Sequence, residues 1–136
     1  MNRFIIIFLI IISIGRTQWE QINLPDNEQV NKIISDGNTL FAGTVFARVY
    51  QSTDNGLNWT QIGSEIDDIS YATDVLHKKD NFLFFSHNIG AGNNNFRCAF
   101  SSGAWGEWEP LQYQASSFPQ MKSNNELLFT IISGGI

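Results

Sequence analysis

The sequence predicts an all-β protein, and three observations carry this prediction. Charged residues make up only 15% of the 136 residues and aromatic residues make up 13%, a balance that argues against disorder. Short runs of β-branched and aromatic residues alternate with Asp, Asn and Gly turns over most of residues 18–136, which is typical of strands. The best window for a helix, 26–34, has a broken apolar spacing and leads into a strand, so we expect no helix.

A repeat organises these strands. Three turn signals recur at steps of 44 residues, from Gly37 to Asn81 to Asn125. Each turn lies between two strand-like runs and therefore predicts a β-hairpin. A second pair of strand-like runs follows each of the first two hairpins. The expected strands are 31–35 with 39–46, 47–52 with 59–62, 72–78 with 82–87, 96–101 with 108–111, and 118–122 with 126–133.

Four short strands in each unit of about 40–50 residues are typical of a β-propeller blade. We therefore predict an incomplete β-propeller of about two and a half four-stranded antiparallel blades. The Gly- and Asn-rich segment 88–95 is interpreted as a loop inserted into the second blade. Within the partial propeller 18–136, the expected parts are an outer strand 19–24, a blade 30–63, a blade 72–112 and a half blade 117–136.

Residues 1–17 are predicted to be a secretory signal peptide. Arg3 precedes the apolar run 4–12, and small residues then allow cleavage after Gly15 or after Thr17. A membrane anchor is the alternative, but an apolar stretch of about 11 residues is too short for a bilayer core, which needs roughly 20. We therefore expect an exported protein (secreted, periplasmic or at the cell surface) without a stable membrane span after removal of the signal.

Charge and cysteine content exclude several classes of function. Lys and Arg number 8 against 13 Asp and Glu, without a basic cluster, so a nucleic-acid surface is not expected. The single cysteine, Cys98, excludes an internal disulfide framework and a cysteine-based zinc site. We expect it to be buried as a small apolar residue. The two histidines, His77 and His87, lack a third ligand for a metal site, and no cofactor is predicted.

One motif identifies a family. Residues 52–59, Ser-Thr-Asp-Asn-Gly-Leu-Asn-Trp, match the pattern Ser/Thr-x-Asp-x-Gly-x-x-Trp. The segment resembles the Asp-box, or bacterial neuraminidase repeat, of sialidase-like β-propellers. We expect Ser52 to bond across the hairpin mouth, Asp54 to accept backbone hydrogen bonds, Gly56 to supply a positive φ, and Trp59 to pack on the sheet.

The resemblance implies a folding role for this box, because in such families it lies on the rim, away from the central channel where substrates bind. A carbohydrate contact through Trp59 is the functional alternative. At the equivalent place in the second blade, residues 101–108 keep Ser101 and Trp108 but lack the Asp and the Gly, so this copy is degenerate. Trp105 has no place in the box pattern, and an exposed aromatic side chain is one interpretation of it.

The resemblance does not bring a catalytic site with it. A sialidase site needs three arginines, a Tyr nucleophile with a Glu partner, and an acid/base Asp. After signal removal only two arginines remain, and no Glu stands in a recognisable motif with a Tyr. Adjacent Asp67 and Asp68 are interpreted as a solvated loop rather than a carboxylate pair or a calcium site. A two-carboxylate site that also draws on Asp74 is harder to exclude. The residues weighed for these sites are Arg48, Arg97, Tyr50, Tyr71, Tyr113, Asp67, Asp68 and Asp74.

Two functions follow as hypotheses. The first is an exported non-enzymatic β-propeller module, or a truncated piece of one, that binds a protein or a glycan. The second is the N-terminal part of a sialidase-like or xyloglucanase-like glycoside hydrolase whose catalytic residues lie in missing blades. Because a ring needs roughly four to eight blades, we expect either further blades or a ring built from several copies. Without them, apolar residues are expected to be uncovered and to invite association, namely Ile33, Phe41, Phe84 and Leu128.

Overall fold

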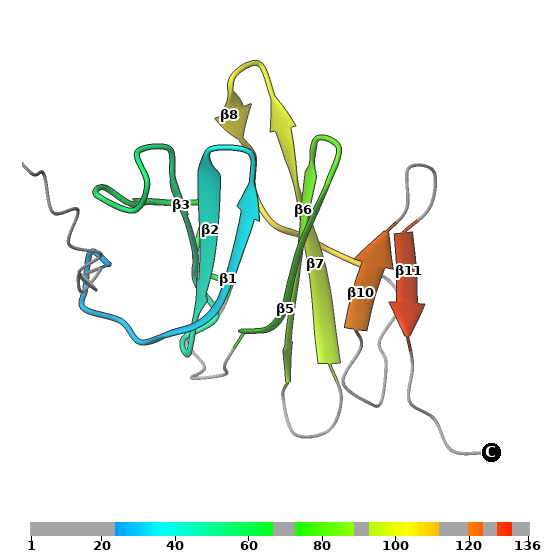
Figure 1. Cartoon of the computed structure of the whole chain (residues 1–136). Coiled ribbons are helices and arrows are strands. Elements are labelled where there is room, and N and C mark those ends of the chain that lie inside the picture. Colours follow the sequence, from blue (N-terminus) through cyan, green and yellow to red (C-terminus); the bar gives the residue numbers. More distant parts are fainter. Residues whose placement is uncertain (1–23, 67–72, 89–92, 112–119, 124–127, 132–136) are drawn as a thin grey trace, which may run out of the picture.

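The computed structural model confirms that the protein is all-β. It describes residues 24–66, 73–88, 93–111, 120–123 and 128–131, and every regular element within these ranges is a strand (Figure 1). The predicted signal peptide 1–17 lies outside the described residues, as does the outer strand 19–24 apart from its last residue, Leu24. Figure 1 shows three β-units side by side, in chain order from left to right.

The first unit is a four-stranded antiparallel sheet with the strands in chain order. Its first hairpin turns at Gly37, which has a φ of +58°, and Asp36 pairs directly with Thr39 across this turn. A left-handed φ favours glycine because a side chain there meets the backbone. The strands lie within the predicted blade 30–63, and they are β1 (Val30–Asp36), β2 (Thr39–Thr44), β3 (Val49–Ser52) and β4 (Thr60–Gln61).

The second unit is a five-stranded antiparallel sheet within the predicted blade 72–112. Its three long strands are followed by a short strand that pairs with the end of the third and by a second short strand that pairs with the middle of the third. The first of these two short strands was not predicted. The strands are β5 (Thr73–Lys79), β6 (Phe82–Asn88), β7 (Asn93–Ser101), β8 (Ala104–Trp105) and β9 (Glu109–Pro110).

The prediction of an inserted loop over 88–95 was wrong at both ends. Asn88 ends β6, Asn93 begins β7, and the two residues pair across the hairpin. Only 89–92 connect the strands. Asparagine is a poor strand former. The register is set by the pairs that follow Phe82 and Ala99 along the two strands, and the ladder of backbone hydrogen bonds then continues through the asparagines.

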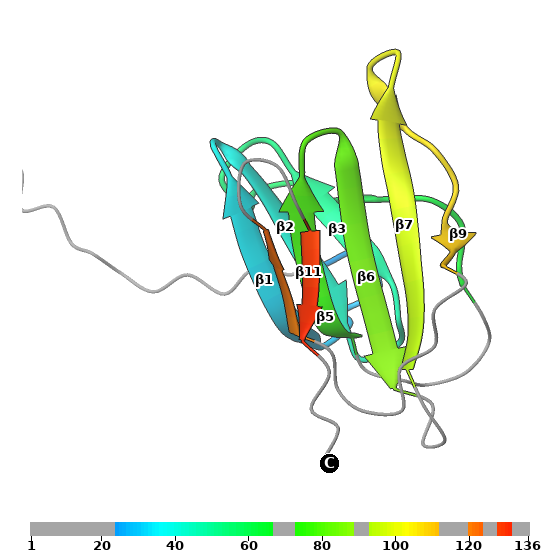
Figure 2. The same cartoon turned by 90° about the vertical axis from the view of Figure 1, so that its right-hand side faces the viewer.

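The third unit is a two-stranded antiparallel hairpin of β10 (Gln120–Ser123) and β11 (Leu128–Ile131). It lies in the predicted half blade 117–136, and the rest of that half blade lies outside the described residues. The first strands of the three units follow one another in space: β1 contacts β5, and β5 contacts β10. Figure 2, turned by 90°, shows β1, β5 and the last hairpin close together in the second view as well.

The hydrophobic core lies between the first two sheets. Phe41 from β2 packs in it against the second sheet and is buried, so the expectation that Phe41 is uncovered was wrong: the neighbouring sheet covers it. Ile33 is exposed as expected, Phe84 is half-buried, and the side chain of Leu128 lies outside the described part of the molecule. The buried core residues are Phe41, Ala47, Val49, Ile62, Leu76, Leu83, Phe85 and Cys98.

Polar contacts add to this packing between the sheets. The Thr73 hydroxyl donates to the carbonyl of Thr44 over 3.0 Å. At the other side of the interface, the backbone N–H and the hydroxyl of Ser64 both donate to Oε2 of Glu107, over 2.8 and 2.6 Å. The two sheets therefore meet through a defined set of hydrogen bonds as well as through apolar contacts.

Candidate functional site

The residues of the predicted Asp-box lie together in one turn after β3. The Ser52 hydroxyl accepts the N–H of Gly56 over 2.8 Å and donates to Oδ1 of Asp54 over 2.8 Å. The Asp54 carboxylate accepts the N–H of Asn58 over 2.9 Å and its side-chain amide over 2.7 Å. These bonds, those of the Asn58 side chain foremost, lower the pKa of Asp54 to about 2.

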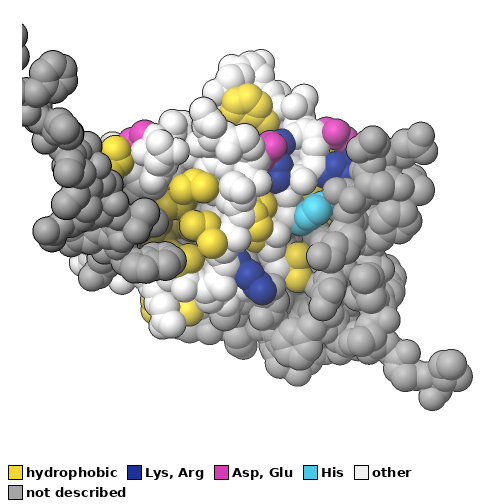
Figure 3. Space-filling view, in the orientation of Figure 1, with side chains coloured by type: hydrophobic (Ala, Val, Ile, Leu, Met, Phe, Trp, Pro, Cys, Tyr) yellow, Lys and Arg dark blue, Asp and Glu magenta, His cyan; other side chains and the backbone are white. Residues whose placement is uncertain are grey.

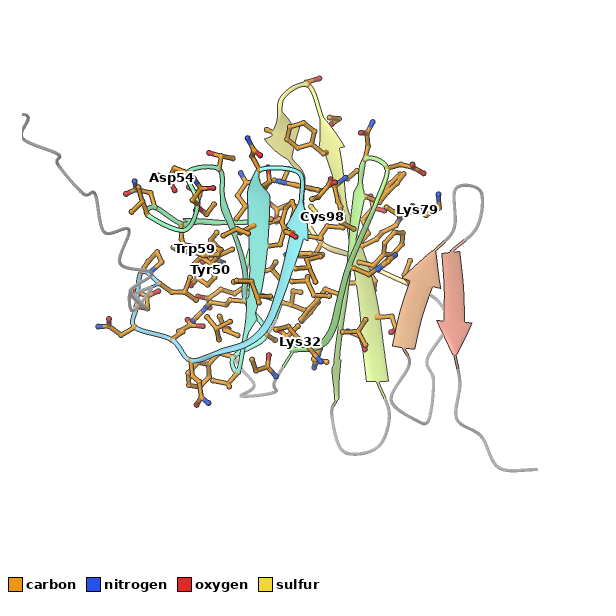
Figure 4. The ribbon with its side chains drawn as sticks, viewed as in Figure 1. Lys32, Tyr50, Asp54, Trp59, Lys79 and Cys98 are labelled. Carbon is orange, nitrogen blue, oxygen red and sulfur yellow. The ribbon has the colours of Figure 1, made fainter. Side chains whose placement is uncertain are left out.

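Gly56 and Trp59 complete this turn. Gly56 has a φ of +90°, and its carbonyl accepts the indole N–H of Trp59 over 3.0 Å. Trp59 is only 8% exposed because it packs against Leu24, Ala42 and Tyr50. Figure 4 shows Asp54 at the tip and Trp59 folded beneath it, next to Tyr50. The polar groups of the turn bond to one another, and the buried indole is not available to stack on a sugar.

The degenerate copy folds differently. Ser101 pairs with Ala104 across a two-residue turn, in which Ser102 and Gly103 have φ values of +52° and +84°. Residues 101–108 thus begin with the tight β7–β8 hairpin instead of a box turn, since positive φ at both central positions is the geometry of such hairpins. Trp108 still packs inward: it is half-buried and donates to the carbonyl of Ile62 over 2.8 Å.

Tyr50 has a glutamate neighbour that the sequence did not indicate. Its hydroxyl lies 3.5 Å from Oε1 of Glu28, which also accepts a hydrogen bond from Arg48, and Arg48 bridges to Glu65 over 2.7 Å. Glu28 precedes β1, 22 positions before Tyr50, and no motif marks it. Tyr50 is 1% exposed, and burial and then the charge of Glu28 raise its pKa to about 12. A tyrosine nucleophile needs the opposite shift and an open site, and Tyr50 has neither, while Arg48 and Glu28 form a part-buried ion pair beside it.

The other described residues considered for chemistry lie on separate parts of the second sheet. His77 pairs with Phe84 and His87 with Thr73, at opposite ends of the β5–β6 hairpin. Arg97 bonds to Glu109 over 3.0 Å on its own sheet. No group of three His, Cys, Asp or Glu in the described ranges could hold a metal ion. Tyr71, Tyr113, Asp67 and Asp68, and the side chain of Asp74, lie outside the described residues.

A groove of about 340 Å³ opens between the two sheets at the end where the hairpins turn. We call it the inter-sheet groove. Trp105 forms part of its wall and is fixed there, because its indole N–H donates to Oε1 of Gln51 over 2.7 Å. The residues that line the groove include Asp36, Gln51, Lys78, Asn81, Phe100 and Trp105.

The groove combines aromatic and polar surfaces. The ring of Trp105 lies edge-on to Phe100, with centroids 5.1 Å apart, and to Phe41, with centroids 5.7 Å apart. Lys78 pairs with Asp36 over 3.3 Å across the sheets. Apolar walls with a few oriented polar groups are typical of ligand pockets. The groove could not be predicted from the sequence, because its residues are brought together only by the packing of two sheets.

No family model, curated protein or solved structure matches this chain. Within the ranges that the structure describes, no helix is long and apolar enough to span a membrane.

Proposed function

We propose that the protein is an exported, non-enzymatic β-propeller module of the Asp-box, sialidase-like kind, or a piece of one, that binds a protein or a glycan. One observation carries the proposal: β1 contacts β5 and β5 contacts β10, so the first strand of each unit lies next to the first strand of the following unit. This is the arrangement that blades have around a propeller axis. The Asp-box turn at Ser52–Trp59 supports the same class.

The free face of the first sheet supports a ring with more blades. Its second apolar cluster, of Leu24, Ala42, Tyr50 and Trp59, lies on the side away from the second sheet. Ile33 is exposed, and Figure 3 shows hydrophobic side chains gathered over the first sheet. The cluster itself is already buried, and a further sheet packed on this face would cover the exposed Ile33. We propose that further blades, or blades of other copies, occupy this position.

Export and the absence of catalysis complete the proposal. Residues 1–17 have the order of a signal peptide, which supports export. Tyr50, the tyrosine that the structure describes, has a glutamate neighbour but is buried and closed to a substrate, which makes the hydrolase alternative the weaker one.

The test uses the full chain expressed in a secreting bacterial host. We expect N-terminal sequencing to find cleavage after Gly15 or Thr17, and native mass spectrometry with electron microscopy to find a closed ring. We expect no release of product from a fluorogenic sialoside or from xyloglucan. A compact monomer with no open sheet face would contradict the propeller, and hydrolysis by this chain would contradict the non-enzymatic function.

A further inference from the structure

The geometry points to the inter-sheet groove as a binding site for one or two rings of a neutral saccharide. This inference rests on the proposed function and names its ligand class and its place. The groove is separate from the Asp-box turn, whose hydrogen bonds are internal. Its volume of about 340 Å³ lies near the lower end of the range for ligand pockets, which suits a short saccharide segment.

Phe100 provides the apolar surface for the sugar. It is 38% exposed, although its backbone is held, since its N–H donates to the carbonyl of Asn81 over 2.7 Å. The rings of Phe100 and Trp105 make an edge contact with their centroids 5.1 Å apart, and Trp105 is held in place by its hydrogen bond to Gln51. The face of an aromatic ring carries partial negative charge and so attracts the C–H groups of a pyranose. A rigid, exposed ring is therefore in place before the ligand arrives.

The polar wall residues match hydroxyl groups. The Asp36 carboxylate is exposed and accepts hydrogen bonds, while Asn81 carries N–H donors. A sugar hydroxyl both donates and accepts, so it pairs with either kind of group. Hydrogen bonds to charged groups are the stronger ones, which makes Asp36 the main polar contact.

The charge balance selects a neutral ligand. Lys78 is the single cation among the described residues that line the groove. It is already paired with Asp36 and also donates to the carbonyl of Asp80. A phosphate, sulfate or sialic acid would meet Asp36 without an uncommitted cation to balance it. A cationic ligand would meet one carboxylate that Lys78 already neutralises.

The experiment measures binding of the secreted full chain to cellopentaose, xyloglucan heptasaccharide, N-acetylchitopentaose and sialyllactose by isothermal titration calorimetry. At least one neutral oligosaccharide should bind, and sialyllactose should not. Phe100→Ala should weaken the strongest neutral complex roughly tenfold or more. Phe82→Ala is the matched control, because Phe82 is 37% exposed on the same sheet and outside the groove, and it should leave the affinity unchanged.

Asp36→Asn provides a second variant if Phe100→Ala reduces folding, as seen in its melting temperature. It removes the charge at an exposed turn and should weaken binding by roughly threefold to tenfold. The inference is overturned if no neutral oligosaccharide in the panel binds, if both variants bind as well as the wild type, or if sialyllactose binds best. Failure here without hydrolysis leaves a protein ligand for the proposed function, whereas a compact monomer with no open sheet face refutes that function separately.

Discussion

The indole N–H of Trp105 in β8 donates to the side-chain oxygen of Gln51 in β3 over 2.7 Å, and this bond joins the two sheets through residues 54 positions apart. The bond holds the end of the unpredicted strand β8 against the first sheet. The short β7–β8 hairpin brings Trp105 over the first sheet, where Phe41 also contacts it. The second sheet is thereby attached to the first at the rim of the inter-sheet groove.

A double-mutant cycle of Gln51→Ala and Trp105→Phe should measure this attachment. We expect a coupling of about 0.5–1.5 kcal/mol in the free energy of unfolding, because the bond is part-buried and neutral. Urea unfolding gives the four free energies. Strictly additive effects would show that the bond contributes nothing to the joining of the sheets.

Ser52→Ala should destabilise the protein by about 1–3 kcal/mol, because the buried N–H of Gly56 then loses its acceptor. The neighbouring change Thr53→Ala is the control, since Thr53 is exposed, and it should alter stability by less than about 0.5 kcal/mol. Urea unfolding of both variants is the measurement. Equal effects of the two changes would contradict the role of Ser52 in the turn.

Asp54 should make stability depend on pH in acid. Its pKa is about 2 in the folded protein, below the ordinary value of 3.8, so the unfolded chain binds its proton more readily. Its contribution is therefore present above about pH 4 and is lost as the pH falls towards 2. Asp54→Asn should flatten the unfolding free energy over this window relative to the wild type. An unchanged pH slope in the variant would rule out the carboxylate as its source.

Gly43→Ala should weaken the contact between the sheets. A Cβ at position 43 would lie 2.5 Å from Cγ2 of Thr73 and 2.8 Å from its Cβ, so one sheet must shift. We expect a loss of about 1–3 kcal/mol, measured by thermal or urea unfolding. Gly106→Ala is the matched control, because its nearest neighbour, the Ala99 carbonyl, lies 3.6 Å away. Wild-type stability in Gly43→Ala would mean that the sheets are not packed this closely.

Cys98 should be unreactive until the protein unfolds. It is buried between the sheets (Figure 4), and burial raises the pKa of its thiol to about 11, so little thiolate forms at pH 8. We expect a thiol-specific disulfide reagent to label it slowly in buffer and at once in concentrated urea. Rapid labelling of the folded protein would contradict its burial.

The strands were largely predictable because their signals are local. Turn residues such as Gly37 and the apolar runs beside them specify hairpins within a few positions, and the expected runs match the observed strands to within a few residues at most ends. The hydrogen-bonded turn after β3 was also predictable, since Ser52, Asp54 and Gly56 bond to one another. Asn58 was missed there, although it lies only four positions after Asp54.

Other features depended on contacts between distant segments. Glu28 meets Tyr50, and Gln51 meets Trp105, only because strands far apart in the chain are packed together. The segment 88–95 read as a loop because asparagine favours turns, but the ladder of a long hairpin extended through it.

The amino-acid sequence by itself determined the all-β class, the hairpin turns and the bonded turn after β3, since each depends on residues that are neighbours in the chain. Only the tertiary structure decided that Phe41 is covered, that Tyr50 is buried beside a glutamate, and that a groove opens beside Trp105. These properties arise where segments distant in the chain meet, and burial and charge at such contacts depend on both partners at once.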